Sequence, residues 1–378
     1  MKVLFIPSWY PNKKDPFYGI FVKEQVIALA ARKISVSVLY ADSSYNKIFN
    51  RQTVEVNQEN GIPVYRLTGF SFPKINKWAL NKWVNQYLTL YELYEKDHGT
   101  PDIIHAHSFV AAYAATIIKK SINRPLVVTE HASGLLKNPI QRRYQKIANF
   151  AYNNSNGIIA VGSLLKKRIS MLTTTSVVQM SNSFNSEIFY PPTTERSKKE
   201  VFKILGVGSF IERKGFEILI QACGQLIHRY EKKIELTLVG NGPLKNKYLK
   251  LIKKLDITES VIIREPLDRA GVADLMRTAH LFCLPSFYET FGVVLIESLA
   301  CGTPVVASGE GGPQEIVNKE NGLLFTAGKG EELEEAINYL FNNYEKYDGE
   351  KLALSTKIKY GQDRIINELI NFYKTFLS

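Results

Sequence analysis

The chain has 378 residues, of which 45% are hydrophobic and 22% are charged. This is the composition of a globular protein, and the length is sufficient for two domains. No apolar run is as long as a membrane span, and the first residues lack the apolar stretch and cleavage site of a signal peptide. The three cysteines are scattered, which predicts free buried thiols in the reducing cytoplasm.

The formal net charge of +12 favours an anionic partner: nucleic acid, an acidic membrane surface or a phosphorylated ligand. The sequence contains no aromatic RNA-binding motif, zinc-finger spacing or basic heptad region. We therefore expect no nucleic-acid partner.

Short apolar runs alternate with helical patterns along the chain. The first run is residues 2–7, followed by a loop at 8–18 and an amphipathic helix at 19–33. Further strand-like runs lie in both halves of the chain, at 34–40, 102–107, 125–131, 157–162, 201–208, 234–240, 261–265, 281–286 and 304–308. This alternation predicts an α/β fold with parallel sheets and helices on both faces.

The segment 72–96 interleaves aromatic and basic side chains on a helical pattern. Such a helix could lie on an anionic membrane, or it could cover the sheet of the first domain. The residues concerned are Trp78, Trp83, Tyr87, Tyr91, Tyr94, Lys74, Lys77 and Lys82. Additional positive charge follows at Lys137, Arg142, Arg143 and Lys146. We expect a cytoplasmic protein, with peripheral contact to the inner face of the membrane left open.

Three histidines lie in or just after strands of the first half. His131 follows a strand at the carboxyl edge of the predicted sheet, where ligands of open α/β sheets bind. A structural role is the alternative. His105 and His107 alternate in a strand, so both side chains lie on one face, which would suit a metal. No third ligand is evident, so we expect this pair to line a cleft.

Residues 181–200 have the composition of a linker, with two asparagines, a proline pair and a charged polar run. The boundary therefore divides a first domain, 1–185, from a second domain, 186–360. The final segment, 361–376, is amphipathic with a helical period.

The second half has a basic pair, Arg213 and Lys214, after a strand that ends in Gly206 and Gly208. Two cations at a helix start, beside free backbone amides, predict a diphosphate site, with a solvated loop as the alternative. Gly240 occupies a second strand-to-helix turn, where glycine allows close backbone approach to a ligand.

The segment 289–315 is the most informative part of the chain. Glu289 precedes an apolar run, and Glu297 follows eight residues later. In one helix these carboxylates would be about 12 Å apart along the axis, too far for a glycosidase pair or a shared metal. They suit two ends of an elongated ligand. Gly311 and Gly312 follow the next strand and can point consecutive amides at an anion.

The pattern Glu289-x7-Glu297, followed by ACGTPVVA and GGPQE, resembles the retaining glycosyltransferases of family 4. That family has the GT-B architecture of two facing Rossmann-like domains with a central cleft. The resemblance covers nearly the whole chain and is dense from 204 to 317. It implies that the second domain binds a nucleotide diphosphate sugar, that the first binds a glycan or lipid-linked acceptor, and that the helix at 361–378 crosses back to the first domain.

The resemblance also implies residue roles. Arg213 and Lys214 would hold the donor diphosphate, and Glu297 would hold the ribose hydroxyls. Glu289 and the glycine turn would hold the hexose. His131 would contact a sugar hydroxyl and, through its carbonyl, stabilise positive charge at the anomeric centre. The implied catalytic set is His131, Arg213, Lys214 and Glu289, and the donor-binding set is Gly19, Gly208, Arg213, Lys214, Gly240, Glu289, Glu297, Gly311 and Gly312. No Asp-x-Asp motif is present, so we expect no metal and no other cofactor.

Two positions depart from the family pattern. Many members carry a glycine pair before the first helix, and here only Gly19 matches because Tyr18 precedes it. Glu265 stands where members often have glycine, which leaves recognition of the base open. Two other functions also stay open: a nucleotide-sugar epimerase of similar architecture, and a non-catalytic nucleotide-sugar-binding subunit.

Overall fold

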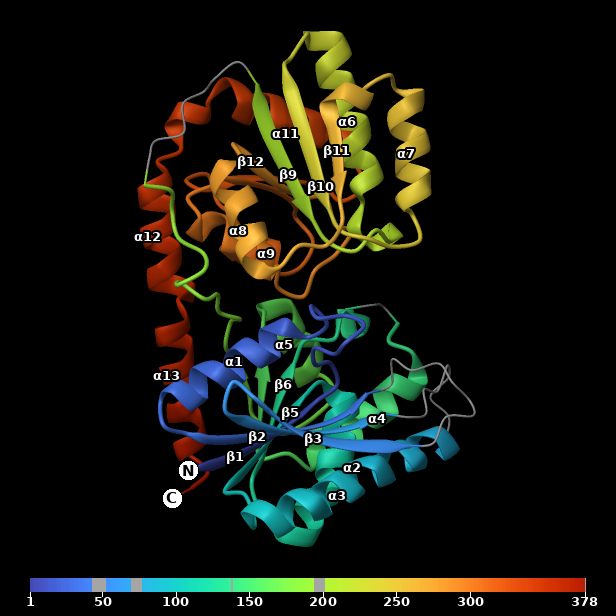
Figure 1. Cartoon of the computed structure of the whole chain (residues 1–378), viewed down its shortest axis with the longest axis vertical. Coiled ribbons are helices and arrows are strands. Elements are labelled where there is room, and N and C mark those ends of the chain that lie inside the picture. The colour runs from blue at the N-terminus through green and yellow to red at the C-terminus, as the bar shows by residue number, and fades with distance from the viewer. Residues whose placement is uncertain (43–51, 69–76, 137–138, 194–200, 378) are drawn as a thin grey trace. The chain divides into compact units, whose positions relative to one another are not determined.

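The chain folds as two compact units in a computed structural model (Figure 1). The first unit comprises Met1–Ser181 and Ile365–Ser378, and the second comprises Asn182–Arg364. The chain leaves the first unit at Ser181, where the sequence placed the boundary at 185, and returns at Ile365, where the sequence placed it at 361.

The structure describes residues 1–42, 52–68, 77–136, 139–193 and 201–377. Part of the predicted linker, residues 194–200, lies outside this range, as do Lys74 and Lys137. The side chains of Lys77 and Trp78 are also outside the described part of the chain.

The sheet of the first unit has eight described strands in the order β3-β4-β2-β1-β5-β6-β7-β8. All neighbours are parallel except β3 and β4, which form an antiparallel hairpin. The strand order reverses between β1 and β5, which makes this point the topological switch of the sheet. The strands are β1 Lys2–Pro7, β2 Ser35–Asp42, β3 Thr53–Glu59, β4 Ile62–Thr68, β5 Ile103–His107, β6 Leu126–Glu130, β7 Gly157–Ala160 and β8 Val177–Gln179. The helices are α1 Ile20–Ala31, α2 Lys77–His98, α3 Phe109–Ile122, α4 Arg142–Asn153 and α5 Ser163–Ser170.

The sheet of the second unit has six described strands, all parallel, in the order β11-β10-β9-β12-β13-β14. Its switch point lies between β9 and β12. The strands are β9 Phe202–Val207, β10 Ile234–Val239, β11 Val261–Arg264, β12 Leu281–Leu284, β13 Val305–Ser308 and β14 Gly322–Phe325. The helices are α6 Phe216–Tyr230, α7 Lys245–Lys254, α8 Arg269–Thr278, α9 Val293–Ala300, α10 Pro313–Ile316, α11 Gly330–Asn342 and α12 Gly349–Tyr360. Helix α13, Gln362–Lys374, starts in this unit and continues into the first. Both units are therefore Rossmann-like, as the family resemblance implied, and their sheets are largely parallel, as the alternating pattern predicted.

The core of the first unit is made by strands buried on both faces. Every residue of β5 is buried, as expected for a central parallel strand. Val22 and Val26 of α1 pack in the same cluster as Ile366 and Leu369 of α13, and all four are fully buried. Helix α13 thus begins in the second unit and completes the core of the first.

Helix α2 covers the sheet of the first unit together with α3, on the face away from α1 (Figure 1). Tyr87, Tyr91 and Tyr94 are at most 4% exposed. The hydroxyl of Tyr87 donates to the carbonyl of Pro7 at 3.0 Å. Of the two alternatives for this helix, membrane contact or cover for the sheet, these three tyrosines therefore take the second. Among the described helices, none combines the length and apolarity needed to cross a membrane.

The core of the second unit contains two of the three cysteines. Cys223 on α6 and Cys283 on β12 are fully buried among side chains of α6, α7 and α11. Cys301 is buried as well, and all three are free thiols, as predicted. Burial raises the pKa of Cys223 to about 12, so this thiol is inert rather than reactive.

Candidate functional site

The second unit brings its charged residues together at the switch point of its sheet. The short turn Glu212–Lys214 follows β9, and the loop with Glu289 follows β12. Because β9 and β12 are parallel neighbours, their carboxyl ends place both loops at one edge. The N–H of Phe287 donates to the carbonyl of Arg213 at 2.8 Å and fastens the two loops together.

Three charged side chains form the centre of this site. Oε1 of Glu289 accepts from Nζ of Lys214 at 2.5 Å and from Oγ of Ser286 at 2.8 Å, and lies 3.2 Å from Nη1 of Arg213. Arg213 also donates to the carbonyl of Tyr288 at 3.3 Å. Two cations therefore face one carboxylate, and the excess positive charge suits an anionic ligand.

The charge of Glu289 is fixed by its surroundings. Its residue is 8% exposed, and burial alone would raise the pKa of its carboxyl group. The charges of Lys214 and Arg213, with hydrogen bonds from Lys214 and Ser286, hold that pKa below its ordinary value. Glu289 is therefore ionised at neutral pH.

The backbone around Glu289 depends on the glycine turn after β13. The N–H of Glu289 donates to the carbonyl of Glu310 at 3.1 Å, and the N–H of Gly312 donates to the carbonyl of Glu289 at 2.9 Å. Gly311 has φ +88°, and a Cβ atom there would lie 2.1 Å from the carbonyl oxygen of Glu289, so only glycine fits. The Gly312 amide is thus occupied by the carbonyl of Glu289. The prediction that Gly311 and Gly312 point two consecutive amides at a ligand is therefore wrong.

Glu297 lies apart from this cluster, on α9. Its side chain is fully buried, and Oε1 accepts from Nη2 of Arg269 at 2.7 Å. Oε2 accepts no hydrogen bond from the described residues. Glu289 precedes the helix, so the assumption of both glutamates in one helix does not apply. No sequence pattern pointed to Arg269, whose guanidinium also lies 4.6 Å from the ring centre of Phe189.

Two further turns of the second unit touch each other. A Cβ atom at Gly240 would lie 1.9 Å from the carbonyl oxygen of Gly208, so glycine is required here by the chain itself. Beside this turn, Asn241 donates to Oε2 of Glu265 at 2.9 Å, and Lys245 pairs with the same carboxylate. These contacts occupy Glu265, the residue that stands where many family members have glycine.

In the first unit, His131 follows β6 and belongs to a chain of rings. Its Nε2 lies 3.0 Å from Nδ1 of His107, and the two rings are stacked. His105 is fully buried, with Nδ1 2.5 Å from the hydroxyl of Tyr373 and Nε2 2.7 Å from that of Thr129. His105 therefore anchors α13 instead of lining a cleft. No group of three metal-binding side chains occurs among the described residues.

Burial sets the protonation of these rings. It lowers the pKa of His131 to about 3, and with the nearby His131 it lowers that of His105 to about 3 as well. Both rings are neutral at physiological pH. His131 can therefore act through a neutral imidazole or its backbone, but not as a cationic acid.

Sequence reasoning missed Glu130, which positions His131. Its buried carboxylate accepts from the N–H groups of His131 and Ala132 at 2.9 and 2.7 Å through Oε1. Oε2 accepts from the N–H of Phe109 at 2.7 Å and the hydroxyl of Tyr152 at 2.6 Å. The sequence contains one clue to this role: Glu130 directly precedes His131 at the end of a strand.

Gly19, the first of the predicted donor-binding residues, lies at the start of α1 with φ 71°.

Two family descriptions match the chain in sequence. "Glycosyltransferase Family 4" matches residues 19–172, and "Glycosyl transferases group 1" matches residues 192–350. The chain belongs to this family of glycosyltransferases. The two matches divide the chain much as its two units do.

Similar proteins cover nearly the full chain of this glycosyltransferase. An uncharacterized glycosyltransferase of Methanocaldococcus jannaschii is 28% identical, over 91% of this chain and 90% of that protein. The putative teichuronic acid biosynthesis glycosyltransferase TuaC of Bacillus subtilis is 27% identical, over 89% and 88%.

Solved structures share the fold. Sucrose-phosphate synthase from Thermosynechococcus elongatus has a TM-score of 0.83 at 20% identity, over 99% of both chains. Anabaena HepE, solved with UDP and glucose, has a TM-score of 0.78 at 20% identity, over 99% of this chain and 100% of that one. At 20% identity this likeness establishes only that the glycosyltransferase shares the two-domain fold.

Proposed function

We propose that the protein transfers a hexose from a nucleotide diphosphate sugar to a hydroxyl of a glycan or lipid-linked glycan, with retention of anomeric configuration. The observation that carries this proposal is the cluster of Arg213, Lys214 and Glu289 at the switch point of the second unit. Relatives add support, since TuaC is named as a putative teichuronic acid biosynthesis glycosyltransferase and HepE was solved with UDP-glucose. Polysaccharide or glycoconjugate biosynthesis is the corresponding pathway class.

In this proposal the basic pair acts on the leaving group. Arg213 and Lys214 are 27% and 16% exposed at their side chains, so a ligand can reach them while they stay partly desolvated. As the bond to the sugar breaks, negative charge develops on the diphosphate, and prepositioned cations stabilise it. Glu289, whose charge is already set, would then accept from a hydroxyl of the hexose.

His131 and Glu297 take supporting roles. As a neutral ring His131 would contact a hydroxyl of the reacting sugar, while its carbonyl faces the developing positive charge. Glu297 would accept from the ribose hydroxyls through Oε2. Because its side chain is fully buried against Arg269, this contact requires Arg269 to shift when the donor binds.

We also propose that the reaction needs no divalent metal, because Arg213 and Lys214 supply the positive charge that a metal would otherwise provide. Turnover should then persist in excess EDTA. Loss of turnover with EDTA, restored by Mg²⁺ or Mn²⁺, would contradict this part of the proposal.

Peripheral membrane contact is proposed for α4 of the first unit. Arg142, Arg143 and Lys146 are all exposed on this helix. Each basic residue near an anionic surface contributes about 1 kcal/mol, so weak binding that is lost in high salt is expected. Sedimentation with anionic and neutral vesicles tests it, and equal binding to both would contradict it.

Thermal denaturation with UDP-, GDP- and ADP-sugars tests the donor assignment. A ligand that binds only the folded state raises the melting temperature. We expect one nucleotide class to raise it, and the shift should disappear when Arg213 and Lys214 are both replaced by alanine. An absence of any shift across the panel would contradict donor binding.

A further inference from the structure

The first unit contains a cavity that none of the candidate site residues explains. Its volume is ≈ 500 Å³, within the range of small-molecule sites. Its walls come from the loop after β1, the first turns of α1, the end of β2 and one face of the β3–β4 hairpin. The cavity lies at the carboxyl edge of the strands β2 and β4, the edge at which open α/β sheets bind ligands.

The floor of this cavity consists of polar side chains in cross-strand rows. Glu55 on β3 pairs in register with Arg66 on β4, and Thr53 pairs with Thr68, which in turn pairs with Asp42 on β2. Because alternate side chains share one face of a strand, both rows face the same way. Arg66 and Asp42 are 8% and 2% exposed. Such burial of polar groups is costly unless partners satisfy them.

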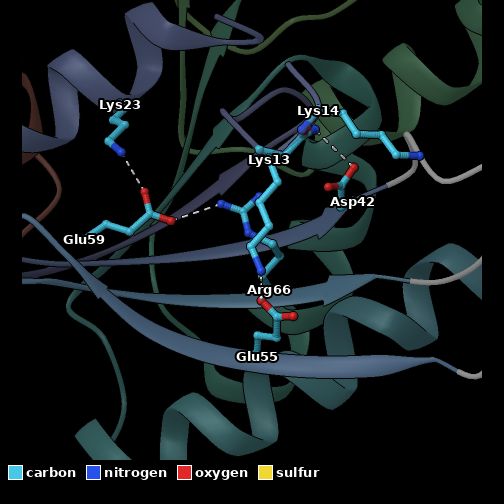
Figure 2. Close-up of polar contacts among 8 residues, drawn as sticks. Lys13, Lys14, Lys23, Asp42, Glu55, Glu59 and Arg66 are labelled. Carbon is cyan, nitrogen blue, oxygen red and sulfur yellow. Dashed lines mark hydrogen bonds and ion pairs between the residues drawn. The ribbon is translucent and has the colours of Figure 1, made fainter. Parts of the chain in front are cut away.

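Arg66 has hydrogen-bonding capacity that the described residues do not use. Its Nη2 donates to Oε1 of Glu59 at 3.1 Å, and Lys23 binds the other oxygen of Glu59 at 2.7 Å (Figure 2). Its Nη1 is buried and donates no hydrogen bond to any described residue. The guanidinium is held by the rings of Tyr40 and Tyr10, 5.2 and 5.8 Å from their centres. Arg66 lines the cavity, and a ligand oxygen there would satisfy this N–H once the guanidinium shifts to expose it.

The charges around the cavity are balanced. Three cationic and three anionic side chains line it: Lys13, Lys23, Arg66, Asp42, Glu55 and Glu59. A site built for phosphate would carry an excess of cations. Here donors and acceptors alternate, and Asn57 and Thr68 add neutral polar groups. A ligand with several hydroxyls matches this lining, because each hydroxyl both donates and accepts.

We propose that this cavity is a carbohydrate subsite that holds a neutral sugar unit of the acceptor. Nη1 of Arg66 donates to a hydroxyl oxygen, and the carboxylate of Glu55 accepts from a neighbouring hydroxyl. Identification of the bound sugar as acceptor rests on the proposed transferase function, whereas sugar binding itself does not.

Saturation-transfer NMR on the full chain tests the binding. The probes are methyl glycosides of glucose, galactose, mannose and N-acetylglucosamine, with methyl glucuronide and inorganic phosphate as the anionic arms. We expect at least one neutral glycoside to bind and phosphate not to displace it. Binding of phosphate or glucuronide alone, or of no neutral glycoside, would overturn the proposal.

Variants on the edge strand β3 locate the site. Glu55→Ala should weaken binding of that glycoside about tenfold, since it removes a charged hydrogen-bond acceptor. Gln58→Ala is the matched control, because alternation places it on the opposite face of the same strand. Arg66→Ala should abolish binding, and its folding is checked by melting temperature because Arg66 also pairs with Glu59. Unchanged binding in folded Glu55→Ala would overturn the site.

Kinetics separate this inference from the transferase proposal. With transfer to a glycoside measured, Glu55→Ala should raise the KM for the acceptor about tenfold and leave the KM for the donor unchanged. If Glu55→Ala transfers sugar with an unchanged KM for the acceptor, the subsite proposal is wrong and the transferase proposal stands. If sugar binding depends on Glu55 but no transfer occurs, the transferase proposal is wrong and the subsite proposal stands.

Discussion

Glu289 is the residue on which the charged cluster of the second unit depends. Its buried Oε1 accepts hydrogen bonds from Lys214 and Ser286 and forms an ion pair with Arg213. Its backbone pairs with the glycine turn after β13. A buried carboxylate in this position keeps two cations in place when no ligand is bound. The same cations become available when an anionic group enters.

Replacement of the basic pair should remove most turnover. We expect Arg213→Ala with Lys214→Ala to reduce the turnover rate about 10²- to 10³-fold, because charge on the leaving group is no longer stabilised. Steady-state kinetics with the preferred donor measure this. Lys250→Ala with Lys253→Ala is the control, since these exposed lysines lie on α7 of the same unit. Near-normal turnover in the folded Arg213, Lys214 variant would refute the assignment.

The two glutamates should act on different parts of the donor. Glu297→Ala should weaken binding of the bare nucleoside diphosphate, whereas Glu289→Ala should spare it and impair binding of the full sugar donor. Each lost hydrogen bond from a charged group costs roughly 1.5 to 3 kcal/mol. Calorimetry with both ligands separates the effects. Equal weakening of the bare diphosphate by both variants would show that the two-ended assignment is wrong.

Sequence reasoning found the residues of this cluster because each stands just after a strand, at the edge where parallel strands bring loops together. It could not find Arg269, whose partner Glu297 lies far along the chain and shows no spacing relation to it. It also wrongly assigned the Gly312 amide to a ligand, because a glycine pair in a sequence does not reveal which carbonyl accepts its N–H groups. Pairing across elements is a property of the packed unit.

At the scale of elements, α13 is joined to the sheet of the first unit through Tyr373. Its hydroxyl lies 2.5 Å from Nδ1 of His105, and the ring is fully buried in the core cluster. The amphipathic pattern at 361–376 predicted a packed helix here. The neutral histidine beneath it was not predicted, since a His-x-His pair in a strand looks the same whether it is buried or exposed.

Buried His105 should make the first unit sensitive to acid. Its pKa is lowered to about 3 by burial and by the nearby His131, so the folded chain leaves it neutral. The unfolded chain protonates it below about pH 6.5. The unfolded state therefore binds the extra proton, and the free energy of unfolding falls by about 1.4 kcal/mol per pH unit as pH drops through this window.

His105→Gln should flatten this dependence. Glutamine cannot titrate, and its amide can still reach the hydroxyls of Tyr373 and Thr129. Melting temperatures recorded from neutral to acid pH should therefore fall less steeply than those of the wild type. His98→Gln, at a partly exposed position in the same unit, is the control. Parallel curves for wild type and His105→Gln would contradict the neutral assignment.

The β3–β4 hairpin shows why other elements escaped prediction. β3 contains Thr53, Glu55 and Asn57 and is exposed or half-buried along its length, so it lacks the apolar run that identified the parallel strands. Its register is set by pairing with β4 at the edge of the sheet. Edge strands of this kind are visible only once the sheet has formed.

At the scale of the whole molecule, each unit arranges parallel strands around a switch point, and the first unit adds the antiparallel strand β3 at one edge. The charged cluster follows β9 and β12, and the histidine chain spans β5 and β6. Alternating apolar runs were enough to predict parallel sheets with helices on both faces, because parallel strands buried on both faces are continuously apolar. The unit boundaries could be predicted only approximately, since the polar and proline-rich composition extends over about twenty residues.

Proton NMR of the reaction tests the central claim most directly. The donor that stabilises the chain is incubated with simple glycosides as acceptors, and the anomeric signals of donor and product are followed over time. We expect a new glycosidic signal with the configuration of the donor, formed only when an acceptor is present. A product of inverted configuration, or rearrangement of the nucleotide sugar without any acceptor, would contradict it.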